Sequence, residues 1–138
     1  MIPEHFSPAR FAEAVATRLN SVVPAGLSVR AEGTGVNLFD PAPWGASRAA
    51  DFIIRDDGRS IAERLAAAAE SIMSSIQDEV MESTKEPWPG EPPGGVLPDA
   101  RVIGAQLHMW FGDETNPVLR LRPLLSQRVR EWRSLTRA

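Results

Sequence analysis

The stretch SIAERLAAAAESIMSSIQDEVMESTKEPWPG, residues 60–90, decides the architecture of this 138-residue chain. Ser60, followed three residues later by Glu63, forms a capping box, which is a signature of a helix start. Apolar side chains then recur every three or four residues, at Ile61, Leu65, Ala69, Ile72, Ile76 and Val80. This spacing predicts one long amphipathic helix over roughly 60–84 whose apolar stripe faces a core.

The helix is followed by EPWPGEPPGG, residues 86–95, whose prolines and glycines can continue neither a helix nor a β-strand. We expect a loop of about a dozen residues, a length often associated with function. Trp88 lies in this loop, and Trp44 lies in a second proline-containing loop at residues 40–45. Each indole has two interpretations, because tryptophan is common in binding hot spots but also covers core edges as a lid.

Before this helix, the chain predicts a shorter helix and two or three strands. Phe11, Val15, Leu19 and Val22 indicate a helix over 8–22, which Pro24 and Gly26 end. Leu27–Ala31 alternates as a half-buried strand, and Val36–Asp40 returns after a glycine turn as a hairpin. Ala50–Arg55 is a candidate third strand, although so short an apolar run is also compatible with helix.

After the long loop, residues Ile103–Phe111 alternate between apolar and polar, which predicts a strand with one buried face. Gly112–Asn116 turns the chain, and Leu119 and Leu121 belong to a returning strand that completes an antiparallel hairpin. Spacing also predicts a short last helix that carries its arginines on the opposite face, with apolar positions Leu125, Val129, Trp132 and Leu135.

These elements predict a single α+β domain over residues 1–138, in the order α-β-β-(β)-α-β-β-α, with no internal repeat. An antiparallel sheet of four to five strands, with the helices packed on one face, would bury every apolar stripe. The other sheet face stays open to solvent or to a partner. Its polar candidates include His108, Arg120 and Arg122, and Trp110 alternates in step with His108.

Charge is unevenly distributed along the chain. The net charge is −3, but residues 117–138 hold six arginines and one acid, so the preceding 116 residues carry about −8. These arginines are candidates for pairing with the acidic part of this chain or of a second copy. Nucleic-acid binding is disfavoured, because the whole chain is acidic, lysine is nearly absent and no binding motif is present.

Several classes of function lack their required residues. The chain has no cysteine, no phosphate loop and no nucleophile elbow. Asp78, Glu82 and Glu86 share one helical face, but a metal site would need ligands from a second element, so a solvated face is favoured. We therefore expect no cofactor and no metal. No signal peptide or membrane-length apolar run is found, so a cytoplasmic location without membrane contact is expected.

Two segments together suggest a resemblance: IQDEVMESTKEPWPG (76–90) and LHMWFGDETNPVLRLRPL (107–124). They resemble a group of small actinobacterial proteins, of no assigned activity, that share a helix-to-EPWP junction and an FGD-to-PVLRL hairpin. The element order separately resembles type III secretion chaperone-like domains. That resemblance implies a homodimer that binds extended segments of partner proteins, although the basic C-terminal part of this chain departs from it.

The leading hypothesis is a non-enzymatic protein-interaction domain, chaperone- or adaptor-like and homodimeric, that binds a protein partner. Its candidate contact residues are Trp88, Trp44, Trp110, His108, Arg120 and Arg122. The alternative is a small enzyme or ligand-binding domain. Its site would be built from His108, Arg120 and Arg122, with loop residues near Trp88 or Trp110.

Overall fold

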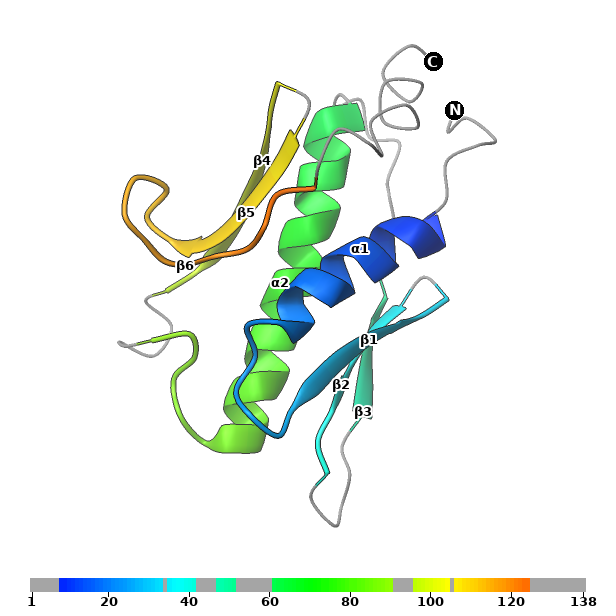
Figure 1. Cartoon of the computed structure of the whole chain (residues 1–138), viewed down its shortest axis with the longest axis vertical. Helices are drawn as coiled ribbons and strands as arrows, with labels where there is room; N and C mark the ends of the chain where they lie inside the picture. Colours follow the sequence, from blue (N-terminus) through cyan, green and yellow to red (C-terminus); the bar gives the residue numbers. More distant parts are fainter. Residues whose placement is uncertain are drawn as a thin grey trace.

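The computed structural model of the chain describes residues 8–33, 35–41, 47–51, 61–90, 96–104 and 106–124. Two helices and six strands lie within these ranges (Figure 1). Their bounds are Pro8–Asn20 (α1), Ser28–Glu32 (β1), Gly35–Phe39 (β2), Ser47–Asp51 (β3), Ile61–Thr84 (α2), Pro98–Ile103 (β4), Gln106–Gly112 (β5) and Pro117–Arg120 (β6). Trp44, residues 52–55 of the predicted third strand and the predicted last helix lie outside the described residues.

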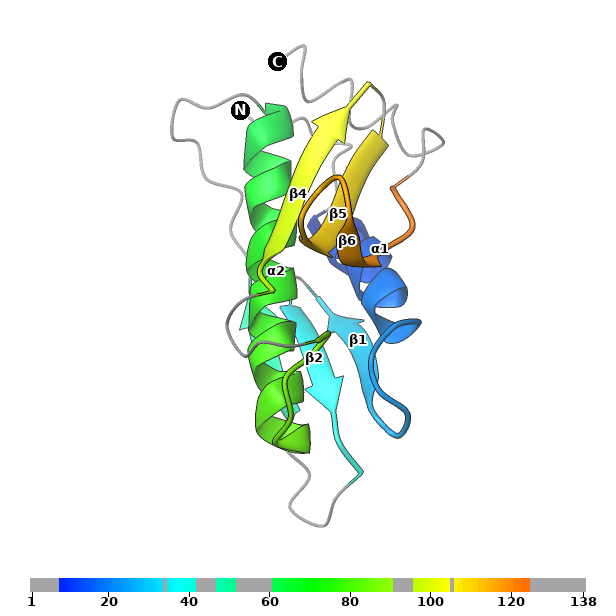
Figure 2. The same ribbon diagram turned by 90° about the vertical axis from the view of Figure 1, so that its left-hand side faces the viewer.

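The α+β class is confirmed, but the expected single sheet is wrong. The strands form two three-stranded antiparallel sheets, in the orders β1-β2-β3 and β4-β5-β6. The 24 residues of α2 extend about 36 Å, whereas the seven residues of β5, the longest strand, span about 24 Å. One sheet is therefore too short to cover the whole helix. The two sheets lie along α2, one towards each end (Figures 1 and 2).

The predicted helices and hairpins are confirmed with small shifts. Helix α1 ends at Asn20 rather than at residue 22, because the N–H groups of Val22 and Val23 both bond the Leu19 carbonyl and close the last turn. The β1–β2 and β5–β6 hairpins form as expected. Strand β3 begins at Ser47, three residues before the predicted start. Eight side chains of the two predicted stripes are buried, namely Phe11, Val15, Leu19, Leu65, Ala69, Ile72, Ile76 and Val80.

The sequence prediction missed strand β4 and merged its end with β5. The chain turns at Gly104, with a φ of 61°, so that Ile103 pairs with Gln106 and β4 runs antiparallel to β5. The two residues that flank a two-residue turn are three positions apart in the sequence, and they pair across the strands on the same face of the sheet. Ile103 therefore shares the outer face with His108 and is 46% exposed, not buried as the alternation suggested.

The fold also contains a repeat that the sequence does not reveal. A helix followed by a three-stranded antiparallel meander occurs twice, as α1-β1-β2-β3 and as α2-β4-β5-β6. Each meander begins with a two-residue hairpin turn whose glycine, Gly33 or Gly104, has a φ of 61°. An arginine, Arg30 or Arg101, lies three residues before each glycine. Both units contribute to one hydrophobic core.

We predict that Gly33→Ala and Gly104→Ala each lower the free energy of unfolding by about 1 kcal/mol, because alanine is disfavoured at positive φ. Nothing lies within 4 Å of an added Cβ at either glycine, so the cost arises in the backbone alone. Urea unfolding measures it. Gly33→Asn and Gly104→Asn should cost less, since asparagine adopts this conformation more readily. Equal losses for alanine and asparagine would contradict this explanation.

Candidate functional site

The loop that follows α2 folds back onto the β4–β6 sheet. The Trp88 ring meets the Phe111 ring edge-on, with centroids 5.2 Å apart and an interplanar angle of 65°. Phe111 is fully buried and Trp88 is half-buried against the core. The two segments that carry the actinobacterial resemblance, 76–90 and 107–124, therefore meet in space. The indole does act as a cover for the core, and part of it remains on the surface.

Gln77 fixes this loop at both of its ends. Its side chain, on α2, is 6% exposed, and its Nε2 donates to the carbonyls of Trp88 (3.1 Å) and Val96 (2.6 Å). One buried amide thus satisfies two backbone acceptors that would otherwise be costly to bury. Gln77 was not among the residues predicted for the site. The available signal was its position between Met73 and Val80, at the spacing of a buried face.

Two large aliphatic side chains stand exposed beside this loop. Leu97 is 64% exposed and Val118 is 52% exposed. They flank Gly112, whose N–H donates to the Leu97 carbonyl at 2.9 Å and whose added Cβ would lie 3.3 Å from a Val118 methyl carbon. Gly90, two residues after Trp88, is similarly close to Val118. We call Trp88, Leu97 and Val118, with the glycines between them, the tryptophan patch.

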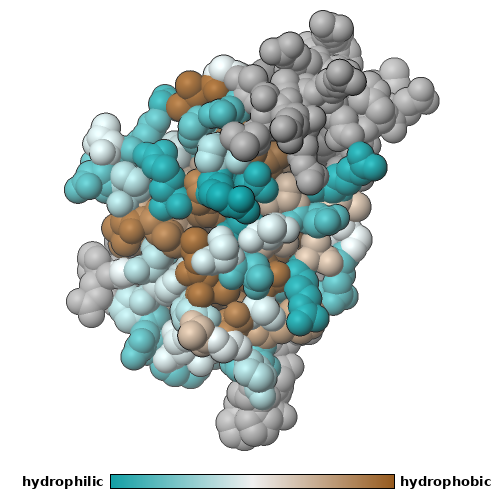
Figure 3. All heavy atoms as spheres, in the orientation of Figure 1, coloured by the Kyte–Doolittle hydropathy of each residue, from teal (hydrophilic) through white to brown (hydrophobic). Residues whose placement is uncertain are grey.

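The tryptophan patch is apolar in a setting that is otherwise polar. Figure 3 shows brown, apolar surface on the side of the molecule where β4–β6 lie, bordered by hydrophilic residues. A Cβ added at Gly90 or at Gly112 would lie 3.2 Å from Val118, so glycine at both positions lets the chain pack closely against this side chain. Contiguous exposed apolar surface with a polar border is typical of protein-interaction sites.

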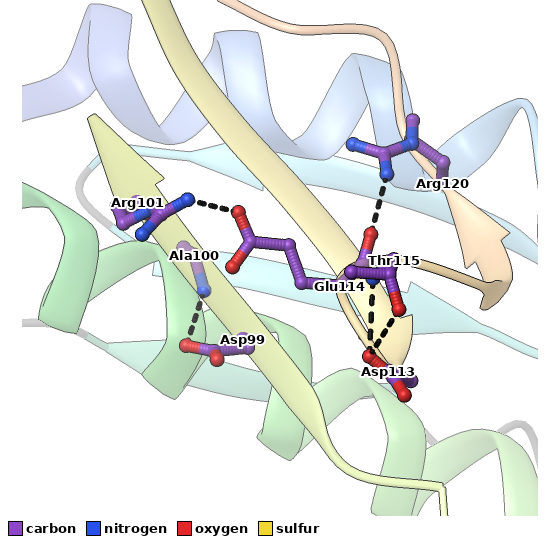
Figure 4. Close-up of polar contacts among 7 residues, drawn as sticks. All are labelled: Asp99, Ala100, Arg101, Asp113, Glu114, Thr115 and Arg120. Atoms are coloured by element: carbon purple, nitrogen blue, oxygen red, sulfur yellow. Dashed lines mark hydrogen bonds and ion pairs between the residues drawn. The ribbon is translucent and has the colours of Figure 1, made fainter. Parts of the chain in front are cut away.

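A network of charges occupies the outer face of the same sheet (Figure 4). Arg101 forms an ion pair with Glu114, and the Arg120 guanidinium donates to the Glu114 carbonyl at 3.0 Å. Asp113 accepts hydrogen bonds from the backbone N–H and hydroxyl of Thr115 at 3.0 and 3.1 Å, which shapes the turn. The turn between β5 and β6 is therefore tied to β4 and β6.

Trp110 lies on this outer face but is not available to a partner. It is 2% exposed, and the Arg120 guanidinium lies 6.0 Å from its ring centroid in a cation–π contact. The expectation of an open face with an accessible indole is thus not met at this position. Its indole nitrogen is buried without a hydrogen-bond partner. The buried ring has a packing role beneath Arg120.

The other predicted site residues lie apart from the two grooves that described residues form. His108 is half-buried and pairs in register with Arg101, whereas Arg120 and Arg122 are exposed. The Arg122 carbonyl accepts from the Arg18 Nε at 2.9 Å, so this residue helps to hold α1 through its backbone. Two grooves lie beside α1 and α2, and none of these three residues lines either of them. Trp44 lies outside the described residues.

Metal and membrane chemistry receive no structural support in the part of the chain that is described. No group of three or more histidine, aspartate or glutamate side chains there is arranged to hold a metal ion. Glu82 instead forms an ion pair with Lys85 at 2.9 Å, and both side chains are well exposed. Neither described helix combines the length and apolarity that crossing a membrane requires.

We predict that Gln77→Leu lowers the free energy of unfolding by about 1–3 kcal/mol, because the Trp88 and Val96 carbonyls both lose their donor. Urea unfolding measures the loss, and limited proteolysis should show faster cleavage within residues 85–97. Ser71→Ala, at an exposed position on the same helix, is the control and should change stability by less than about 0.5 kcal/mol. A Gln77→Leu variant as stable as the control would show that the bonds contribute nothing.

We predict that Trp88→Ala costs about 2–3 kcal/mol of stability, somewhat less than the loss of a fully buried tryptophan, since the Phe111 edge contact disappears. Trp88→Phe should recover most of this loss, because an aromatic edge is retained. Thermal or urea unfolding measures both variants. Unchanged stability in Trp88→Ala would instead support the interpretation that the indole serves a partner alone.

Comparison of the chain with protein-family models, curated proteins and solved structures finds no match. The resemblances to the small actinobacterial proteins and to type III secretion chaperone-like domains therefore stay expectations. The geometry of the tryptophan patch is the observation from which a function can be argued.

Proposed function

We propose that this chain is a non-enzymatic protein-interaction domain, of adaptor or chaperone type, that binds a protein partner through the tryptophan patch. The observation that carries the proposal is the pair Leu97 and Val118, which are 64% and 52% exposed beside the half-buried Trp88. Exposed aliphatic side chains held on a fixed platform are what a hydrophobic interface core requires.

The platform is preorganised, which lowers the entropic cost of binding. Gln77 holds both ends of the loop, and the ring of Trp88 is seated on Phe111. Burying the exposed parts of Leu97 and Val118 is worth about 1–2 kcal/mol each, or together roughly a hundredfold in Kd. That contribution suits a moderate, regulated interaction.

We further propose that the protein is a cytoplasmic homodimer. The support is the acidic net charge of −3 and the element order, which resemble those of chaperone-like domains. Nucleic acid is a less suitable partner, because a net positive charge is found only over residues 117–138 and Arg120 is already engaged with Glu114. The enzyme alternative has less support, because His108, Arg120 and Arg122 line neither of the two grooves formed by described residues.

We predict that Leu97→Asp and Val118→Asp each reduce capture of the partner at least tenfold, because each places a charge in an apolar contact. Ile103→Asp is the matched control: Ile103 is 46% exposed at the other end of β4, outside the tryptophan patch. Tagged wild type and variants serve as baits in lysate of the native host, with quantitative mass spectrometry. The partner is the protein lost with Leu97→Asp and Val118→Asp but kept with Ile103→Asp.

Identical capture by all four baits would overturn the assignment of the tryptophan patch. Light scattering coupled to size exclusion tests the homodimer separately, and a strictly monomeric species at micromolar concentration would contradict it. Urea unfolding of each variant confirms that the exposed substitutions leave the fold intact.

A further inference from the structure

A groove runs between the N-terminal half of α2 and the free edge of β4. The two elements lie side by side in Figure 2. Its volume is about 290 Å³, and its floor is made of alanines and other small side chains. It is lined by Ala62, Glu63, Ala66, Ala67, Glu70, Ala100, Arg101 and Val102. We call it the α2–β4 groove. It lies along the part of β4 that is farther from Leu97, and it shares no residue with the tryptophan patch.

The register of the sheet shows which backbone groups of β4 face away from β5. The Gly112 N–H donates to the Leu97 carbonyl, which makes these two residues a hydrogen-bonded pair. Such pairs alternate along an antiparallel ladder, so Asp99 and Arg101 bond to β5. The backbone groups of Pro98, Ala100 and Val102 therefore lie on the free edge.

This edge offers acceptors but few donors. Pro98 has no N–H, and the Ala100 N–H already donates to the side chain of Asp99 at 2.8 Å. Between residues 98 and 102 the edge keeps three carbonyls and the single N–H of Val102. An added β-strand would need free N–H donors as well as carbonyl acceptors along this edge. The edge has few such donors, so strand addition is disfavoured here. A ligand rich in N–H donors fits the edge better.

The charges of the groove favour a cation. Partial burial raises the pKa of Glu70, and the nearby charge of Asp99 raises it further, so these carboxylates repel each other without a counter-ion. The positive charge of Arg101, which also lines the groove, is paired with Glu114 on the outer face of the sheet. Guanidinium groups carry five N–H donors and a permanent charge, and they bind both carboxylates and carbonyls.

We propose that the arginine-rich segment 125–138 of the same molecule docks in the α2–β4 groove. The segment carries Arg128, Arg130, Arg133 and Arg137 against one acid, Glu131, whereas residues 1–116 carry about −8. Its apolar residues, spaced three or four apart, include Leu125, Val129, Trp132 and Leu135. The alanine floor lets such side chains approach α2 closely. This inference goes beyond the proposed function and does not depend on it.

The point at which the segment leaves the fold makes this docking geometrically possible. Leu124 exchanges hydrogen bonds with Leu107, at 3.0 and 3.4 Å, and Leu107 pairs with Val102 of β4. Residue 124 is thus two strand spacings, about 10 Å, from the strand wall of the groove. The fourteen residues that follow reach at most about 45 Å, which is ample to turn around the end of the sheet.

Paramagnetic relaxation in the cysteine-free chain tests this directly. A nitroxide attached to Ala67→Cys in the groove should reduce the amide signals of residues 130–138, which are not held near the groove by Leu124, at least twofold at about 20 mM salt. The effect should disappear at about 500 mM salt, where the Debye length is near 4 Å. The control is a nitroxide at Glu82→Cys, an exposed position about 22 Å farther along α2, which should leave the signals of residues 130–138 unchanged.

Charge reversal tests the partners of the contact. Glu70→Lys should abolish the broadening, whereas Glu13→Lys, the same change in the α1 groove, should not. The double substitution Arg128→Glu with Arg133→Glu gives a second test that leaves the described fold untouched. Equal broadening from both labels, or broadening that survives Glu70→Lys and the double substitution, would overturn the proposal.

The same experiment distinguishes docking within one molecule from docking on a second copy of the chain. Mixing isotope-labelled protein without nitroxide with unlabelled, nitroxide-bearing protein reports only contacts between molecules. Broadening in that mixture would show that the segment docks on a second copy, which contradicts docking in the same molecule. No broadening in either arrangement would show that the groove does not bind this segment.

Discussion

The length of α2 is the constraint on which the rest of the structure depends. A buried stripe of about 36 Å cannot be covered by strands of seven residues or fewer, so two sheets share it. Each sheet is built by the same means, a helix followed by an antiparallel meander, and each leaves its first strand at an edge beside a helix. The grooves beside α1 and α2 are therefore consequences of the same division.

The free edges of β1 and β4 are each protected by a side chain that accepts a hydrogen bond from a backbone N–H pointing away from the sheet. Asn20 accepts from the Val29 N–H at 2.8 Å on β1, and Asp99 accepts from the Ala100 N–H at 2.8 Å on β4. Capping the edge in this way removes donors that a foreign strand would need, and so reduces the risk of edge-to-edge pairing. It also changes what each groove recognises, because the carbonyls stay available. Protection of the edge and selection of a donor-rich ligand are thus one feature.

Local patterns were sufficient to predict both helices, two hairpins and the α+β class, because spacing within an element is set by its own geometry. They were insufficient at Gly104, where a two-residue turn continues the alternation and hides a strand boundary. The candidate site was harder to predict than the fold. Trp88 was identifiable from its loop, but Leu97 and Val118 carry no local signal, since their exposure follows from which strands become neighbours. Gln77 was not identified, because its spacing indicates burial at most, and its role follows from its two carbonyl partners.

Strand β4 connects the two surfaces to which binding roles are assigned. Leu97 precedes its first residue, and Ala100–Val102 line the groove, so the two surfaces are separated by about 10–17 Å along the strand. Sites at this distance without shared partners behave nearly additively. Coupling would require an element with two discrete arrangements, whereas the structure holds β4 to β5 in one continuous register. A partner on the tryptophan patch and a basic segment in the α2–β4 groove are therefore expected to bind independently.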